Sequence, residues 1–320
     1  MKVAFYSPHL CLRGTTVALY DYAKFNQDIL GNESIILYDK IDARNDSTTI
    51  AKFSATFEVL SVTGNQNIEE VDRVTSKEKA NAIYVVKGGS PKDGILPKSV
   101  KSLIHVIGMS GPENKHGDVW AYASYFLKKS CSRGIDIPVV PYMVHLPNIE
   151  NDMREELGIS KNSIVFGRTG GLDTWNLPFA NNVIYDVLQK RKDVYFLFQN
   201  TNIPFRHERI LHLPSTADVI FKTKFINTCD AMIHARSEGE SFGLACAEFS
   251  FKNKPVITWN GSSERSHLEI LGEKAHVYYS PKDLYDCIIN FERRFDDYNC
   301  YHEYTPNNIM KKFKQVFLDQ

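Results

Sequence analysis

No stretch of the sequence is apolar over the roughly 20 residues that a helix needs to cross a bilayer. The short apolar run at 2–7 meets Pro8, and it lacks both the length and the small-residue cleavage site of a secretory signal peptide. The six cysteines are scattered without a CxxC pair, so we expect free thiols rather than disulfides or zinc ligands. Together these absences predict a cytoplasmic protein.

The sequence also lacks a net charge, because 38 Lys and Arg residues balance 38 Asp and Glu residues. This balance argues against a protein whose main task is to bind nucleic acid, since that affinity depends on a positive field facing phosphates. Lys311, Lys312 and Lys314 are the nearest candidates for contact with a membrane surface, and a solvated helix face is the simpler interpretation. Membrane contact is therefore expected to be peripheral at most.

Several motifs of other chemistries are missing. No GxGxxG follows the first apolar run, which argues against an NAD-binding domain. No P-loop lysine motif, HxxxH spacing or GxSxG elbow is present. No DxD pair follows a predicted strand, as a divalent cation on a pyrophosphate would need, and Asp296 and Asp297 are predicted to lie at the surface. We therefore expect no metal ion and no cofactor.

What the sequence does contain is an alternation of short apolar, β-rich runs with helical stretches. Its 320 residues, with 43% apolar and 24% charged, are enough for two globular domains with cores of their own. Strands that alternate with crossover helices predict a mostly parallel sheet covered by helices on both faces. The alternation runs twice, so the predicted fold class is α/β, with two Rossmann-like doubly wound domains.

The predicted elements fall into these two series, with a junction near 141–151, where Pro141 and Pro147 and a polar stretch suit a linker. The predicted strands are 3–7, 34–38, 58–62, 82–86, 103–107 and 137–142, and then 163–166, 194–199, 210–213, 231–235, 255–259 and 275–279. The predicted helices are 15–30 and 119–129, and then 180–190, 222–228, 242–251, 282–295 and 308–317.

The sharpest motif is the stretch ESFGLACAE, which follows a predicted strand and opens a helix. It begins at Glu240 and ends at Glu248, about two helical turns further along the same face. Two carboxylates so placed can accept hydrogen bonds from the hydroxyl pairs of a ribose and a hexose. The helix start carries Phe242, Gly243 and Leu244. A glycine there lets backbone amides approach an anion at a helix N-terminus, which two merely solvated glutamates would not require.

A second motif, VFGRTGG, ends the first strand of the second series. The guanidinium of Arg168 offers a forked positive charge, and Gly170 and Gly171 let the backbone come close to a phosphate. The alternative interpretation is a glycine-rich turn that carries a surface arginine. The motif favours a site for a diphosphate.

These two motifs resemble those of retaining GT-B glycosyltransferases, especially of family four. In that family the first glutamate contacts the hydroxyls of the donor sugar and the second holds the ribose, so the resemblance assigns these roles to Glu240 and Glu248. The Gly-Arg segment with Arg168 resembles the family's segment at the same topological place. One departure is clear: the family usually has a lysine several residues after the arginine, and here the stretch 172–175 has none.

The resemblance extends more loosely to other loops. Gly14 and Thr15 match a loop that faces the donor phosphates across the cleft between the domains, and Ser262 lies where backbone amides approach the pyrophosphate. An ordinary serine-rich turn explains Ser262 equally well. Family members carry a histidine near the reacting sugar. Both His105, within a predicted strand, and His116, in a loop, compete for that role, although a histidine in a strand is more often a core residue.

The predicted site therefore has two groups of residues. Catalytic roles are predicted for Glu240, His105, His116 and Arg168, and donor binding for Glu248, Gly14, Thr15, Gly170, Gly171, Phe242, Gly243, Leu244 and Ser262. The resemblance implies an acceptor domain over 1–147, a nucleotide-sugar donor domain over 148–300, and a last segment, 301–320, that packs back on the first domain.

The function implied is transfer of a sugar from a nucleotide-diphosphate sugar to a glycan, lipid or protein acceptor, with retention and without metal. A GT-B-fold nucleotide-sugar epimerase is one alternative, because it shares the two-domain fold. A non-catalytic subunit that binds a nucleotide sugar or a glycan is another, kept open by the missing lysine. A periplasmic-type binding module is the least favoured, since the sequence shows no signal peptide.

Overall fold

The computed structural model describes residues 1–64, 67–93, 96–294 and 296–320. The chain divides into two compact units. Unit 1 comprises Met1–Met143 together with Tyr304–Gln320, and unit 2 comprises Val144–Glu303. The division thus falls after Met143, where the sequence predicted a boundary at 147, and the end of the chain belongs to unit 1.

Among the described residues, unit 1 holds a parallel sheet of six strands in the order β3-β2-β1-β4-β5-β6. Its strands are β1 (Lys2–Ser7), β2 (Glu33–Asp39), β3 (Glu58–Val62), β4 (Ala82–Lys87), β5 (Lys101–Val106) and β6 (Val119–Tyr122). Its helices are α1 (Gly14–Asp28), α2 (Ser47–Ser54), α3 (Ile68–Lys77), α4 (Tyr125–Cys131) and α10 (Pro306–Phe313), with short turns η1 (Pro112–Asn114) and η3 (Lys314–Leu318). This strand order is that of a doubly wound sheet.

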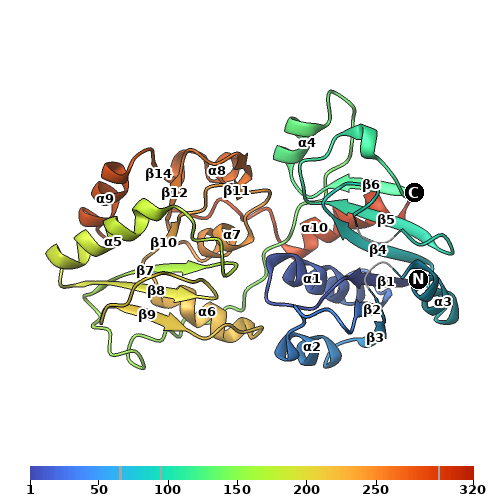
Figure 1. The fold of residues 1–320 in the computed structure, drawn as a ribbon, viewed down its shortest axis with the longest axis horizontal. Helices are drawn as coiled ribbons and strands as arrows, with labels where there is room; N and C mark the ends of the chain where they lie inside the picture. Colours follow the sequence, from blue (N-terminus) through green and yellow to red (C-terminus); the bar gives the residue numbers. More distant parts are fainter. Residues whose placement is uncertain (65–66, 94–95, 295) are drawn as a thin grey trace. The chain divides into compact units, whose positions relative to one another are not determined.

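An aromatic cluster ties the end of the chain to unit 1. Phe313 of α10 stacks on Tyr22 of α1, with ring centroids 5.1 Å apart, and Phe317 of η3 packs edge-on against Tyr84 of β4. These rings are buried, and α10, drawn in red, lies beside α1 in Figure 1. Since buried aromatic side chains dominate the energetics of a core, this cluster explains why 304–320 belongs to unit 1.

Unit 2 repeats the architecture with the strand order β14-β12-β10-β7-β8-β9 and a small pair, β11-β13, among the described residues. Its strands are β7 (Ile164–Thr169), β8 (Val194–Gln199), β9 (Ile210–Leu213), β10 (Ala231–His234), β11 (Gly239–Glu240), β12 (Val256–Trp259), β13 (Glu264–Arg265) and β14 (His276–Tyr278). Its helices are α5 (Pro178–Lys190), α6 (Val219–Thr228), α7 (Leu244–Phe251), α8 (Ser266–Leu271) and α9 (Pro281–Ile289), with the short turn η2 (Gly272–Lys274).

Helices cover both faces of this second sheet (Figure 1). Buried side chains of α5 and α9 form one apolar cluster with Phe166, Ile233 and Ile257 of the central strands. The rings of Phe225 in α6 and Phe249 in α7 pack against each other, 6.0 Å apart, outside that cluster. The predicted doubly wound fold is therefore confirmed in both units. None of the described helices combines the length and apolar character that crossing a bilayer requires.

Two predicted elements of unit 1 are wrong. The predicted helix at 119–129 is the strand β6 followed by α4. The sequence of β6 is buried throughout, and the Ser124 hydroxyl caps α4 by accepting a hydrogen bond from the Leu127 amide. The predicted strand at 137–142 contributes a single bridge, between Val139 and Tyr122. Apolar residues buried on a sheet and on a helix are alike in composition, so the short run at 119–122 did not reveal its period.

The four predicted helices of unit 2 all have different limits in the structure, where α5 begins at Pro178 and α6 at Val219. The helix predicted from 242 begins at Leu244, because Gly243 has a φ of +89°, outside the helical region. The helix predicted over 282–295 ends at Ile289 in the structure, and its predicted last residue, Phe295, lies outside the described residues.

Candidate functional site

Glu240 lies just beyond the carboxyl end of β10, in the short strand β11 that pairs with β13. The backbone fixes its position through Gly239, which has a φ of +78°. A Cβ atom at Gly239 would lie 2.0 Å from the carbonyl oxygen of Glu264, so only glycine fits this approach between the two strands. Ligands of doubly wound sheets bind beyond the carboxyl ends of the strands, which is where Glu240 lies.

Both carboxylate oxygens of Glu240 have cationic or N–H partners. His234 Nε2 lies 3.0 Å from Oε1, and Arg236 Nη1 lies 3.1 Å from Oε2. Burial raises the pKa of this carboxyl, but the hydrogen bond from His234 and the charges of Arg236 and Arg168 outweigh it and lower the pKa to about 2. Glu240 is therefore an ionised carboxylate that accepts hydrogen bonds.

Arg168, at the end of β7, is buried, with 1% of its surface exposed. Its Nη2 donates to the carbonyl oxygen and hydroxyl of Thr174, at 3.2 and 2.8 Å. Its Nε and Nη1 have no hydrogen-bond partner among the described residues. Burial lowers the pKa of this guanidinium, and the charge of Glu240 opposes the effect. The alternative of a surface arginine is thus wrong, and the structure leaves a buried cation with unused donors.

The glycines after Arg168 form the turn that covers it. A Cβ atom at Gly170 would lie 2.7 Å from Arg168 Nη2, so the backbone there runs directly against the guanidinium. Asn200 Nδ2 donates to the Gly170 carbonyl at 2.6 Å, and the Thr174 hydroxyl donates to the Gly171 carbonyl at 2.7 Å. The sequence-predicted residues Arg168, Gly170 and Gly171 therefore lie together.

Glu248 lies on α7 and is also buried, so it is not a solvated helix residue. Its Oε1 is 2.6 Å from Nζ of Lys222, which comes from α6. Sequence reasoning did not select Lys222, because nothing in the spacing of α6 distinguishes it from a surface lysine. The ion pair gives the buried carboxylate the partner that burial of a charge requires.

The first turn of α7 brings further predicted residues close to Glu240. A Cβ atom at Gly243 would lie 3.0 Å from the Cβ of His267 and 3.2 Å from the Cβ of Glu240. Phe242 is buried, and its ring packs edge-on against Tyr301, 5.8 Å away, so its side chain belongs to the core. Leu244 is half-buried at the first position of the helix.

The Ser262 hydroxyl forms hydrogen bonds with two backbone carbonyl groups. Its buried hydroxyl donates to the carbonyl oxygen of Trp259 at 3.2 Å and approaches that of Arg236 at 3.4 Å. The serine thereby ties the loop after β12 to the loop that carries Arg236. This geometry is that of a residue that fixes a loop.

The predicted residues of unit 1 occupy three separate settings. His105 is fully buried, with Nδ1 2.5 Å from the Tyr84 hydroxyl and Nε2 2.7 Å from the Val140 carbonyl, and burial lowers its pKa to about 4. This is the core histidine that the sequence offered as the alternative. His116 is half-buried after η1, with Nδ1 2.6 Å from the Asn114 carbonyl, and burial lowers its pKa. Gly14 and Thr15 open α1.

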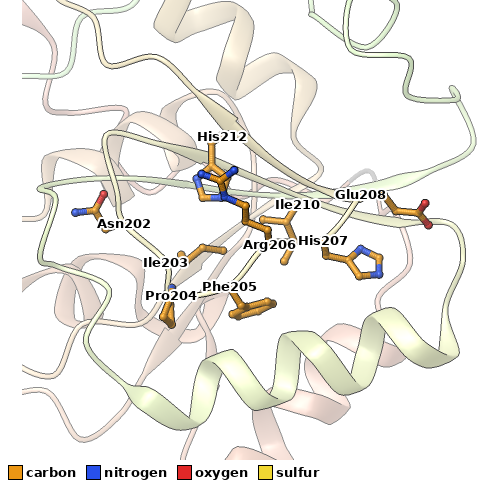
Figure 2. A pocket seen from close by; sticks show the side chains of 9 residues that line it. All are labelled: Asn202, Ile203, Pro204, Phe205, Arg206, His207, Glu208, Ile210 and His212. Atoms are coloured by element: carbon orange, nitrogen blue, oxygen red, sulfur yellow. The ribbon is translucent and has the colours of Figure 1, made fainter.

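A hollow of about 730 Å³ lies elsewhere in unit 2, beside the edge strand β9. Figure 2 shows Ile203, Phe205 and Ile210 in its middle, with Asn202 toward one end and Glu208 toward the other. None of the sequence-predicted site residues lines it. No group of three or more His, Cys, Asp or Glu side chains in the described ranges is arranged to hold a metal ion.

Comparison with known proteins gives a fold. No family model and no curated protein sequence matches the chain. A glycosyltransferase from Rickettsia africae has 14% identity and a TM-score of 0.66, with 100% of this chain and 99% of that chain covered. Anabaena HepE in complex with UDP and glucose has 15% identity and a TM-score of 0.64, covering 99% and 95%.

A third similar structure belongs to another class of enzyme. A putative UDP-N-acetylglucosamine 2-epimerase from Listeria monocytogenes has 12% identity and a TM-score of 0.59, covering 97% of this chain and 94% of that chain. At such identities the likeness shows the fold alone. The predicted GT-B architecture of two Rossmann-like domains is thereby confirmed.

Proposed function

We propose that the chain is a glycosyltransferase, and that unit 2 binds a nucleotide-diphosphate sugar as the donor of the sugar. The observation that carries the proposal is Arg168, a buried guanidinium whose Nε and Nη1 donors are unused in the described structure. Leaving such donors unpaired inside a protein is costly, and a diphosphate offers the oxygens that match a guanidinium fork. The acceptor, whether glycan, lipid or protein, stays open.

Arg168 can contact a diphosphate only if the turn that covers its guanidinium moves. The turn at 170–174 lies over the guanidinium and is held by hydrogen bonds from Asn200 and within the turn itself. We infer that donor binding shifts this turn and exchanges the Thr174 contacts for phosphate oxygens. The amides at the start of α7 lie at the same end of the sheet as Arg168, and a helix N-terminus favours an anion.

The two glutamates supply the hydroxyl contacts in this proposal. Glu240 accepts from the donor sugar, because a carboxylate oxygen that already accepts one hydrogen bond can accept another. Glu248 accepts from the ribose through Oε2, while its Oε1 stays with Lys222. Gly14, Thr15 and Ser262 remain predicted donor-binding residues, and His116 remains a predicted catalytic residue.

The chemistry that this arrangement favours is stabilisation of the leaving nucleotide diphosphate by fixed charge. Arg168 is desolvated, so its field on a developing phosphate charge is stronger than it would be in water. The proposal includes retention of configuration, membership of family four and activity without a metal ion. It also includes a cytoplasmic location, which the six free cysteines favour.

The test is donor binding and turnover in the presence of EDTA. Purified protein is incubated with UDP, UDP-glucose, GDP and ADP, and unfolding temperatures are compared for the wild type, Arg168→Lys and Glu248→Gln. A ligand at about 100 times its Kd stabilises the fold by about 2.7 kcal/mol. We expect one nucleotide family to shift the wild type and both variants to lose the shift, with Arg206→Gln in the separate hollow as the matched control.

Product analysis separates the alternatives. Conversion of the sugar in the absence of any acceptor would make the chain an epimerase. Binding without turnover against a broad panel of acceptors would make it a non-catalytic subunit. A strict requirement for manganese would contradict the metal-independent mechanism. No thermal shift with any nucleotide would remove the proposal.

A further inference from the structure

A chain of buried polar side chains ends on Glu240. His267 Nε2 of α8 lies 2.9 Å from the Thr258 hydroxyl of β12, and that hydroxyl lies 3.1 Å from Nδ1 of His234 in β10. His234 Nε2 then lies 3.0 Å from Glu240 Oε1. The first three side chains have no exposed surface, whereas 19% of the Glu240 side chain is exposed. This series of hydrogen-bonded side chains therefore connects the interior of unit 2 to its candidate site.

The Glu240 carboxylate at the end of this series of side chains sets the direction of every hydrogen bond in it. The ionised carboxylate of Glu240 can only accept, so Nε2 of His234 carries the hydrogen and Nδ1, in the neutral ring, does not. The Thr258 hydroxyl then gives its single hydrogen to His234 Nδ1. Its oxygen is left to accept a hydrogen bond from Nε2 of His267.

The far end of the chain agrees with this assignment. A neutral His267 that carries its hydrogen on Nε2 has a bare Nδ1, and this atom has no hydrogen-bond partner among the described residues. Burial lowers the pKa of both histidines, so both are neutral at pH 7. The positive charges that face the rings, Arg168, Arg236 and Arg265, oppose protonation in addition, and Glu240 favours it.

The opposite tautomer of His234 would break the contact with Glu240. With its hydrogen on Nδ1, the ring would turn a bare lone pair at Nε2 toward a carboxylate oxygen 3.0 Å away. The Thr258 hydroxyl supports the same tautomer by donating to Nδ1, and it points its hydrogen that way while His267 occupies its acceptor side. A buried set of polar groups is costly unless fully paired, and an apolar side chain at 258 would fill the same space.

We propose that Thr258 and His267 are positioning residues for Glu240: the hydrogen bond from the Thr258 hydroxyl to Nδ1 holds the His234 ring in the orientation in which its Nε2–H fixes Oε1 and presents Oε2 to the donor sugar. The proposal rests on the proposed function, because that function assigns Glu240 to the sugar. Thr258 acts through two intervening contacts and touches no substrate. Its role is to orient the His234 ring, which differs from filling space.

The direct test needs no substrate. Protein labelled with ¹⁵N-histidine gives long-range ¹H–¹⁵N spectra that report the tautomer of each ring, and His234→Gln and His267→Gln assign two of the ten histidines. We expect Nε2–H at both rings of the wild type at pH 7. Thr258→Val should leave Nε2–H on His234, because Glu240 still requires it, but should shift the ¹⁵N resonance of Nδ1, which loses its hydrogen-bond donor; Thr258→Ser, which keeps the hydroxyl, should leave that resonance in place. An Nδ1–H tautomer in the wild type, or an unchanged Thr258→Val spectrum, would overturn the proposal.

The second test measures the consequence at the site, using calorimetric titration with UDP-glucose and with UDP. Thr258→Val should weaken binding of UDP-glucose about tenfold and leave UDP within about twofold, because Glu240 faces the sugar and not the nucleotide. Thr258→Ser should bind both ligands as the wild type does. An equal loss for both ligands would indicate a general disturbance and would overturn the positioning role.

Two further outcomes keep the conclusions separate. If the wild type binds neither ligand, the proposed function fails and the positioning role falls with it, although the spectra still establish the tautomers. If Thr258→Val does not fold, His267→Phe provides the second measurement. That variant removes the donor to Thr258, frees its hydroxyl to turn away from His234, and should give the same sugar-specific loss; no such loss would overturn the proposal.

Discussion

His105 of unit 1 and His234 of unit 2 occupy similar positions in the interiors of their units and have the same hydrogen pattern. Both are fully buried on a strand of a doubly wound sheet, and both have hydrogen-bond partners at the two ring nitrogens. In each ring Nε2 faces an acceptor, the Val140 carbonyl in one case and the Glu240 carboxylate in the other. The two histidines differ in the groups to which these partners lead.

The hydrogen-bond partners of His105 lead to no exposed or charged group among the described residues. Tyr84 and Val140 are themselves buried, and rings of Tyr22, Tyr142 and Phe317 surround the imidazole. The partners of His234 lead to a charged group that is partly exposed. Burial and full pairing therefore do not separate a structural histidine from one that serves a site; the charge and exposure of the group at the end of its network do.

The largest loss of stability is expected from a change in the backbone that positions Glu240. Gly239→Ala places a Cβ 2.0 Å from the Glu264 carbonyl oxygen at a φ of +78°. Positive-φ strain together with the displaced strand β13 should lower the free energy of unfolding by about 3 to 4 kcal/mol, measured by urea denaturation. The same variant should abolish donor binding, because Glu240 is the next residue.

A matched control isolates the contact from the strain. Gly158 in the same unit has a φ of +65°, and a Cβ atom added there would meet no described atom within 4 Å, so Gly158→Ala tests the backbone conformation alone. We expect a loss of about 1 to 2 kcal/mol for this control. Equal losses in the two variants would show that the approach of β11 to β13 is not what fixes Glu240.

The pH dependence of His105 should be the next in size. Its folded pKa of about 4 lies below the usual value of 6.5, so the unfolded chain binds a proton that the folded chain refuses. Stability is therefore lost as the pH falls from 6.5 to about 4, by about 3 kcal/mol for this group. His105→Phe removes that dependence, which denaturation curves at pH 7 and pH 4 measure as a difference from the wild type. A parallel fall in both proteins would mean that His105 titrates normally.

Glu240 should affect the free energy of unfolding over a lower pH range than His105 does. Its folded pKa of about 2 lies below the usual 4.5, so its contribution is present above pH 4.5 and lost as the pH falls toward 2. Glu240→Gln should cost about 2 kcal/mol at pH 7 and should differ progressively less from the wild type below pH 4.5. A difference between the two proteins that is constant from pH 7 to pH 3 would contradict an ionised, charge-paired Glu240.

The fold was predictable because its signal is repeated. Short apolar runs that alternate with helices mark a parallel sheet wherever they occur, so the two doubly wound sheets followed from the pattern. The segment 119–131 failed because a strand and a short helix lie side by side without a turn signal between them. Its composition is apolar throughout the first part, and a run of that length fits either period.

The sequence could nominate candidate site residues only where they are close together along the chain. Glu240, Gly243 and Glu248 belong to one continuous motif, and Arg168 to another, so the sequence could select both as candidates. Thr258 and His267 come from different elements, and only the parallel pairing of β10 with β12, which sets His234 opposite Thr258, brings them to Glu240. His105 was selected for its place in a strand, but sequence position does not reveal which partners close around a ring.

The smallest expected effect compares the two histidines directly. His234→Gln replaces the ring N–H by an amide NH2 in a different position, so the fixed distance to Glu240 is lost, and we expect the affinity for UDP-glucose to fall about tenfold in calorimetric titrations. His105→Gln, with the same chemical change in unit 1, should leave that affinity within about twofold, because its partners Tyr84 and Val140 lead to no ligand group. If His105→Gln weakened donor binding as much as His234→Gln, the network in unit 1 would not be closed, and His105 would regain the active-site role that its strand position first suggested.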